Sequence, residues 1–109
     1  MSFETVPPVS VQPQATLTRW RVFETELGQR HLVGHCVESS HGRVTSAVVS
    51  FDFRTRTGIT SSGRRYALSG NSGYDDDAQY IWLLWTLYNA VKEFKDVTEE
   101  YDAPCNTIQ

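Results

Sequence analysis

The side chains best suited to chemistry near neutral pH are His31, His35 and Cys36, which lie close together in the sequence. Imidazole and thiolate are the usual general base and nucleophile at this pH. On a β-strand, however, His35 and Cys36 point to opposite faces and cannot hydrogen-bond without a distortion. His31 and His35 would be ~13 Å apart, too far to ligate one metal ion. The spacing therefore favours ordinary sheet residues, and His41, beside Gly42, is typical of a turn.

Three consecutive carboxylates, Asp75, Asp76 and Asp77, are the other cluster that attracts notice. Successive helical residues point about 100° apart, so these groups do not converge on one cation, and no glycine-spaced calcium loop surrounds them. They are better suited to the start of a helix. The glycines match no phosphate-binding loop, and Cys36 and Cys105 match no zinc spacing, so we expect free thiols and no metal or cofactor.

The elements that must position these side chains follow from the residue pattern. Between Leu17 and Leu68, short segments rich in Val, Thr, Phe, Tyr and Trp alternate with turn residues, which indicates a β-meander. Short connections favour antiparallel neighbours. The predicted strands are residues 18–26, 30–38, 43–51, 56–60 and 65–69.

A helix is predicted over residues 75–93, begun by the three aspartates and followed by a polar segment. The sequence thus predicts an α+β fold, an antiparallel meander of four to five strands with one C-terminal helix packed on one face. The domain is expected over 17–94, between a flexible arm at 1–16 and an acidic tail at 95–109. Helical spacing predicts an inward stripe of Ala78, Ile81, Leu84, Trp85, Tyr88 and Val91. The strand residues expected to meet it are Trp20, Val22, Ala47, Val49, Phe51, Tyr66 and Leu68.

This arrangement leaves apolar residues without a partner. Because one helix covers one face of a sheet, the opposite pleat is expected to stay open unless something else covers it. The residues concerned are Phe23, Leu32, Cys36, Val44 and Val48 on the strands, with Trp82, Leu83 and Leu87 on the helix. Either the terminal segments fold over this surface, or a second copy or another protein does.

Composition narrows the class of protein. The chain of 109 residues carries a formal charge of −3, which argues against a polycation that coats nucleic acid. The charge is uneven, with eight arginines against five acids in residues 1–70 and eight acids against two lysines in 71–109. No run of residues is apolar enough to cross a bilayer, and the first residues do not show the basic segment and apolar stretch typical of a signal peptide. We expect a single cytoplasmic domain with no membrane contact.

The stretch FDFRTRTGITSSGRRYALSG, from Phe51 to Gly70, followed by Ala78, Tyr80 and Trp82, resembles small proteins encoded on bacterial plasmids, prophages and integrative elements. The resemblance covers residues 19–90 and brings no catalytic residue. It implies an inhibitor of host defence, such as an anti-CRISPR protein, that acts by occupying a surface on a larger complex.

The sequence predicts a non-enzymatic protein that acts by association, with a protein partner or as a homodimer. The apolar surface, flanked by charge, would be formed by Phe23, Leu32, Val44, Val48, Trp82, Leu87, Arg19 and Arg21. One alternative is a small hydrolase that uses His35 or Cys36. Another is binding of single-stranded nucleic acid, with Arg19, Arg21 and Phe23 contacting phosphates and bases.

Overall fold

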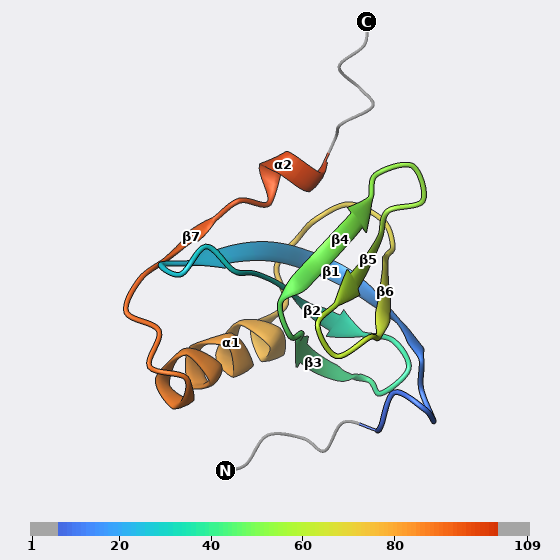
Figure 1. The fold of residues 1–109 in the computed structure, drawn as a ribbon, viewed down its shortest axis with the longest axis horizontal. Helices are drawn as coiled ribbons and strands as arrows, with labels where there is room; N and C mark the ends of the chain where they lie inside the picture. The colour runs from blue at the N-terminus through green and yellow to red at the C-terminus, as the bar shows by residue number, and fades with distance from the viewer. Residues whose placement is uncertain (1–6, 103–109) are drawn as a thin grey trace, which may run out of the picture.

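The computed structural model describes residues 7–102, and its elements form a strongly curled sheet with one long helix beside it (Figure 1). Two three-stranded meanders come first, followed by α1, a short strand and a second helix. The elements are β1 (Gln14–Thr25), β2 (Arg30–Cys36), β3 (His41–Val44), β4 (Val48–Asp52), β5 (Thr57–Thr60), β6 (Arg65–Leu68), α1 (Asp76–Tyr88), β7 (Phe94–Asp96) and α2 (Glu99–Asp102).

The two meanders are joined edge to edge by a parallel pair. The seven-stranded sheet has the order β3-β2-β1-β6-β5-β4, and β7 pairs with the C-terminal half of β1. Gln14 to Leu17 run parallel to Arg65 to Leu68, and this segment includes residues expected to belong to the arm. The α+β class is confirmed, whereas the purely antiparallel meander of four to five strands is wrong. The reason is that the start of β1 offers a free edge to β6.

A β-bulge bends β1 in the middle. Arg19 has a φ of 48°, and the register with β2 shifts between Thr18 and Arg21. The extra residue reverses the alternation of the strand. As a result Leu17 and Trp20, three residues apart, both point into the same core.

The predicted strand over residues 43–51 is broken into β3 and β4 at a corner. The Thr45 hydroxyl accepts a hydrogen bond from the Leu32 backbone N–H at 3.0 Å and donates to the Ser46 carbonyl at 2.7 Å. These bonds turn the chain away from β2. β4 can therefore pair with β5, and the second meander folds across the first.

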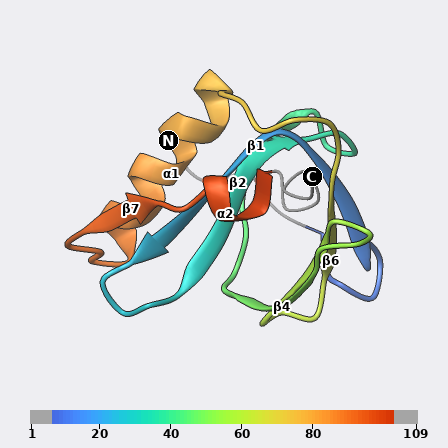
Figure 2. The ribbon, with the colours of Figure 1, turned by 90° about the horizontal axis from the view of Figure 1, so that it is seen from above.

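Two cores result, one on each face of β1 and β2. The first lies between the meanders and is closed by α2, and the second lies under α1 (Figure 2). The first contains Ala15, Leu17, Trp20, Val22, Leu32, Cys36, Tyr66, Leu68, Val97 and Tyr101, with Val48 and Phe51 beside them. The second contains Phe23, Val33, Ala78 and Trp82, with Val44 and Trp85 beside them. Of the residues predicted to meet the helix, five belong to or line the first core instead: Trp20, Val22, Phe51, Tyr66 and Leu68. Ala47 belongs to neither core, and Val49 is exposed.

The start of α1 is as predicted. The Asp75 carboxylate accepts a hydrogen bond from the Ala78 backbone N–H at 3.0 Å and caps the helix. The Asp77 carboxylate accepts one from the Gly42 N–H at 2.6 Å. Glycine is required there, because a Cβ at position 42 would lie 2.5 Å from the Ala78 nitrogen. This close approach fixes α1 against β3.

The segment expected as an acidic tail contributes β7 and α2 in its described part. Val97 and Tyr101 are buried in the first core, and the Val97 N–H donates to the Val22 carbonyl at 2.9 Å. The tail therefore covers part of the sheet face that one helix alone would leave open. Residues 1–6 of the predicted arm and 103–109 of the predicted tail, Cys105 among them, lie outside the described residues.

Candidate functional site

The residues predicted to form an apolar surface are divided among three places. Phe23, Val44 and Trp82 belong to the core under α1, whereas Leu32 and Val48 belong to or line the core between the meanders. Leu87 alone among the six apolar residues is largely exposed. The prediction of an open sheet face is wrong. The second meander and α2 cover one face of β1 and β2, and α1 covers the other.

The flanking arginines bind acids within the chain. The Arg19 guanidinium lies 2.8 Å from the Asp75 carboxylate, and the Arg21 guanidinium lies 2.6 Å from the Asp96 carboxylate. Burial would raise the pKa of Asp75, but the hydrogen bonds from Arg19 and the Ala78 N–H outweigh it and lower the pKa. The basic part of the sequence thus attracts the acidic part and attaches α1 and β7 to β1.

In the hydrolase alternative, His35 is half-buried in the middle of the sheet, where it pairs with Gly42 of β3. Cys36 is a free cysteine with no exposed surface, and its thiol lies 3.7 Å from the Glu38 carboxylate, so it is inaccessible to a substrate. Phe23 is buried beneath α1 and cannot stack on a base. Within residues 7–102, no cluster of His, Cys, Asp and Glu is arranged to hold a metal ion, and no helix is long and apolar enough to span a membrane.

The most exposed apolar surface on a regular element is the outer face of α1. Tyr80 is 53% exposed, Leu83 47% and Leu87 77%, and Leu84 between them is half-buried. The opposite side of the helix holds Trp82, whose ring stacks on Phe23 with centroids 5.0 Å apart. We call Tyr80, Leu83, Leu84 and Leu87 the outer α1 face.

The outer α1 face was missed because the helix is apolar on both sides. The sequence interleaves two stripes, and the prediction assigned Leu84 and Tyr88 to the buried one and Trp82 to the other. In the structure Trp82 is fully buried, whereas Tyr88 is exposed. The spacing of Tyr80, Leu83, Leu84 and Leu87 was a signal that could have been read, since residues three and four apart share one face.

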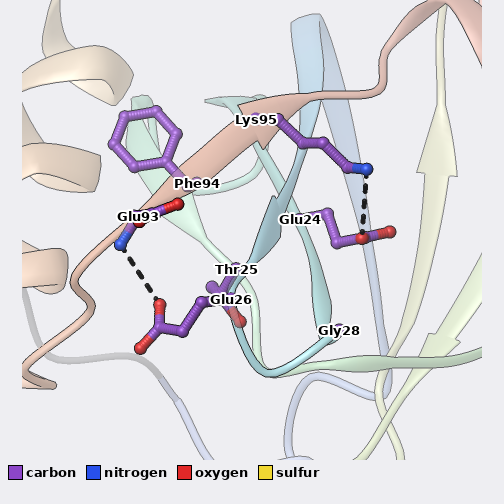
Figure 3. Close-up of a pocket in the computed structure, with 7 residues that line it drawn as sticks. All are labelled: Glu24, Thr25, Glu26, Gly28, Glu93, Phe94 and Lys95. Carbon is purple, nitrogen blue, oxygen red and sulfur yellow. Dashed lines mark hydrogen bonds and ion pairs between the residues drawn. The ribbon is translucent and has the colours of Figure 1, made fainter.

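A cavity of about 370 Å³ lies where β7 meets the C-terminal end of β1 (Figure 3). The side chains of Glu24, Glu26 and Lys95 on its wall have partners within the chain. The Glu26 carboxylate accepts hydrogen bonds from the backbone N–H groups of Lys92 and Glu93, each at 3.2 Å, and Lys95 lies 3.7 Å from Glu24. The hydrogen bond from Arg30 lowers the pKa of Glu24, and backbone N–H groups lower that of Glu26. These contacts attach β7 and the segment before it to β1.

Comparison with known proteins gives no assignment. No protein-family model matches the chain, and no curated protein or solved structure is significantly similar to it. The candidate site therefore rests on its own geometry.

Proposed function

We propose that this protein is a non-enzymatic binding module that associates with a second copy of itself through the outer α1 face. The observation that carries the proposal is the exposure of Tyr80, Leu83 and Leu87 on one side of a helix whose other side is already packed. A helix that is apolar all round is normally buried on all sides. A partner that covers the outer α1 face would complete that burial.

The spacing of the outer α1 face favours a second copy as the partner. Along the chain, the intervals between Tyr80, Leu83, Leu84 and Leu87 are three, one and three residues, the same in both directions. A two-fold axis between Leu83 and Leu84 would therefore place Tyr80 of each copy against Leu87 of the other. Such self-complementarity is what an isologous dimer requires.

Charge at the two ends of the helix supports the same antiparallel pairing. In such a dimer we expect the start of one α1, with exposed Asp76, to face the end of the other, beyond which Lys92 is exposed. Opposite charges meet at both ends, and the two helix dipoles run in opposite directions. α1 has 13 residues, so the interface is small, and we expect a dissociation constant on the order of micromolar or weaker.

Sedimentation equilibrium over micromolar to millimolar concentration tests the proposal. We expect a reversible monomer–dimer equilibrium for the natural chain. Leu83→Lys places two cations beside the two-fold axis and should leave a monomer at every concentration. The matched control is Val49→Lys on β4, which changes an equally apolar residue that is 63% exposed away from α1 and should dimerise normally. A natural chain that stays monomeric throughout this range would overturn the proposal.

A charge exchange tests the antiparallel arrangement. Asp76→Lys alone and Lys92→Glu alone should each weaken the dimer, because each change places like charges together at both ends. The double variant restores opposite charges and should recover most of the lost affinity. Additive losses in the double variant would show that these residues do not face each other.

The role implied by the resemblance to mobile-element proteins, including inhibition of a defence complex such as CRISPR-Cas, stays a prediction that rests on that resemblance alone.

A further inference from the structure

The two ends of the strand order β3-β2-β1-β6-β5-β4 differ in what lies beside them. β3 lies against α1, where the Gly42 N–H donates to the Asp77 carboxylate at 2.6 Å. β4 pairs with β5 on one edge, and no described strand pairs with its other edge (Figure 1). A free strand edge carries backbone N–H and C=O groups that can pair with another extended chain. We call this free side of Val48–Asp52 the β4 edge.

The hydrogen-bond pattern of the sheet shows which backbone groups lie on the β4 edge. In an antiparallel pair, successive residues direct their N–H and C=O groups alternately toward the partner strand and away from it. The Thr60 N–H bonds to the Arg64 carbonyl on the side of β6, so Gly58, two residues away, also faces β6 rather than β4. Phe51 is opposite Gly58 and therefore directs its N–H and C=O away from β5. Across the β4 edge, no described residue bonds to either group.

A cleft of about 550 Å³ lies along the β4 edge. Residues 48–51 line it, whereas no described residue of β5 does, so the cleft is on the free side of β4. Part of its wall is apolar, because the rings of Phe51 and Tyr101 meet there with centroids 5.0 Å apart. Val49, also on the wall, is 63% exposed. The cleft thus offers backbone groups and apolar contacts side by side.

The charges around the cleft indicate the kind of segment that fits it. Arg30 is the single charged residue among the described ones that line the cleft, and its guanidinium already bonds to Glu24 and Glu100, each at 2.8 Å. α2, which reaches the cleft through Tyr101, carries three acids and no base. The border of the cleft is therefore acidic, which favours a partner with lysine or arginine side chains.

We propose that the β4 edge binds an extended, basic peptide segment of another protein as an additional strand. The backbone of the segment bonds to the N–H and C=O of Phe51, its apolar side chains pack on Val49 and Tyr101, and its basic side chains meet the acids of α2. This is a second binding surface, separate from the proposed dimer interface, because the residues of the outer α1 face do not line the cleft.

The probe is a short peptide of alternating valine and threonine with a lysine at each end. Titrated into the isotope-labelled chain, it should shift the NMR signal of the Phe51 amide saturably and slow the exchange of that amide with solvent, because the N–H becomes hydrogen-bonded. The Leu83→Lys variant should behave in the same way, so a failure of the dimer proposal does not affect this result. No saturable shift up to millimolar peptide would overturn the proposal.

The same measurement without peptide shows whether the β4 edge is free. The Phe51 amide of the dilute chain should exchange rapidly. Protection already present in the dilute chain would show that another segment of the chain covers the edge, and protection that appears only at high concentration would assign the edge to a second copy. Either result would contradict the proposal.

Two altered peptides separate backbone pairing from charge. An ester analogue replaces the backbone N–H groups of the valines and threonines by oxygen and keeps every side chain. It should bind about tenfold more weakly, the loss of one or two hydrogen bonds. A peptide with glutamate in place of lysine should also bind more weakly, because its charge repels α2. An ester that binds as well as the parent would exclude strand pairing, and a glutamate peptide that binds as well would exclude a basic partner.

A pair of valine substitutions locates the site on the chain. Val49→Lys removes an apolar contact and adds a cation beside the lysines of the peptide, so it should weaken binding about fivefold or more. Val37→Lys is the matched control, because Val37 is 49% exposed, follows β2 and does not line the cleft, and it should bind the peptide normally. Equal weakening in the two variants, or none in either, would place the peptide elsewhere and refute the assignment to the β4 edge.

Discussion

The two sides of α1 carry similar side chains in different surroundings. The inner side holds Trp82 and Trp85, whose rings stack with centroids 5.4 Å apart against Phe23 and His31 of the sheet. The outer side holds Tyr80 and three leucines in contact with solvent. Residue type alone therefore does not show which side stabilises the fold and which is free for association. The difference arises from where β3 meets the helix.

The largest expected difference between the two sides is in stability. Trp82→Ala removes a fully buried ring from the core under α1 and should lower the free energy of unfolding by about 3 to 5 kcal/mol. Denaturant unfolding of dilute protein measures this without a contribution from the dimer. A loss below about 1 kcal/mol would contradict the packing of α1 on Phe23. Trp82, which the sequence placed on the surface for a partner, is a residue of the folded core.

The close contact between α1 and β3 should respond to a single methyl group. Gly42→Ala forces a Cβ against the Ala78 backbone and should cost about 1 to 3 kcal/mol of unfolding free energy. Gly73→Ala is the control, because its Cβ would lie 3.4 Å from the nearest atom of Arg19, an ordinary contact. Equal stability of the two variants would show that α1 does not lie as close to β3 as the structure places it.

Acid should lower the free energy of unfolding through His31, which packs against Trp85 on the inner side of α1. Its pKa is below 6.5 in the folded chain and near 6.5 in the unfolded chain, so the unfolded state takes up the proton first as pH falls. Stability should therefore decrease from pH 6.5 downward until the folded pKa is passed, by at most about 1.4 kcal/mol per pH unit.

Unfolding measured above the range where carboxylates titrate, for the natural chain and His31→Phe, isolates this effect. Every other titratable group is the same in both proteins, so its contribution cancels in the difference. A variant that loses as much stability as the natural chain over this range would assign the pH dependence to other groups.

The smallest expected change is on the outer side. Leu87→Ala removes a side chain that is 77% exposed and should alter the unfolding free energy of the monomer by no more than about 0.5 kcal/mol. The same substitution should weaken the dimer. Dilute denaturant unfolding checks the first expectation, and sedimentation checks the second. A large loss of monomer stability would remove the distinction between the two sides of α1.

Local signals predicted much of the fold. The aspartates indicated the start of α1 at the correct residue, and alternation located most strands to within a few residues. What could not be predicted depends on long-range contacts. The bulge at Arg19 reverses the pleat, so Trp20 and Val22 turn away from α1. The bonds between Thr45 and Leu32 divide one expected strand into two.

The outer α1 face could not be predicted from the sequence for a related reason. An apolar helix gives no sign of which side faces the sheet, and the assignment of Trp82 and Leu87 to one surface combined residues from opposite sides. Assigning the sides requires the position of β3 and of Gly42, which only the folded chain supplies.

The position of β1 has a consequence for the order in which the chain folds. β1 is made first, yet its N-terminal half pairs with β6 and its C-terminal half with β7, whose residues are Phe94 to Asp96. Contacts between residues so distant in sequence form slowly, because the entropy cost of closing a long loop comes before the contacts can stabilise the chain. On the ribosome, β1 and β2 can meet as a hairpin early in synthesis. The edge of the C-terminal half of β1 stays unpaired until residues 94–96 have emerged, and during that interval it is open to pairing with another nascent chain.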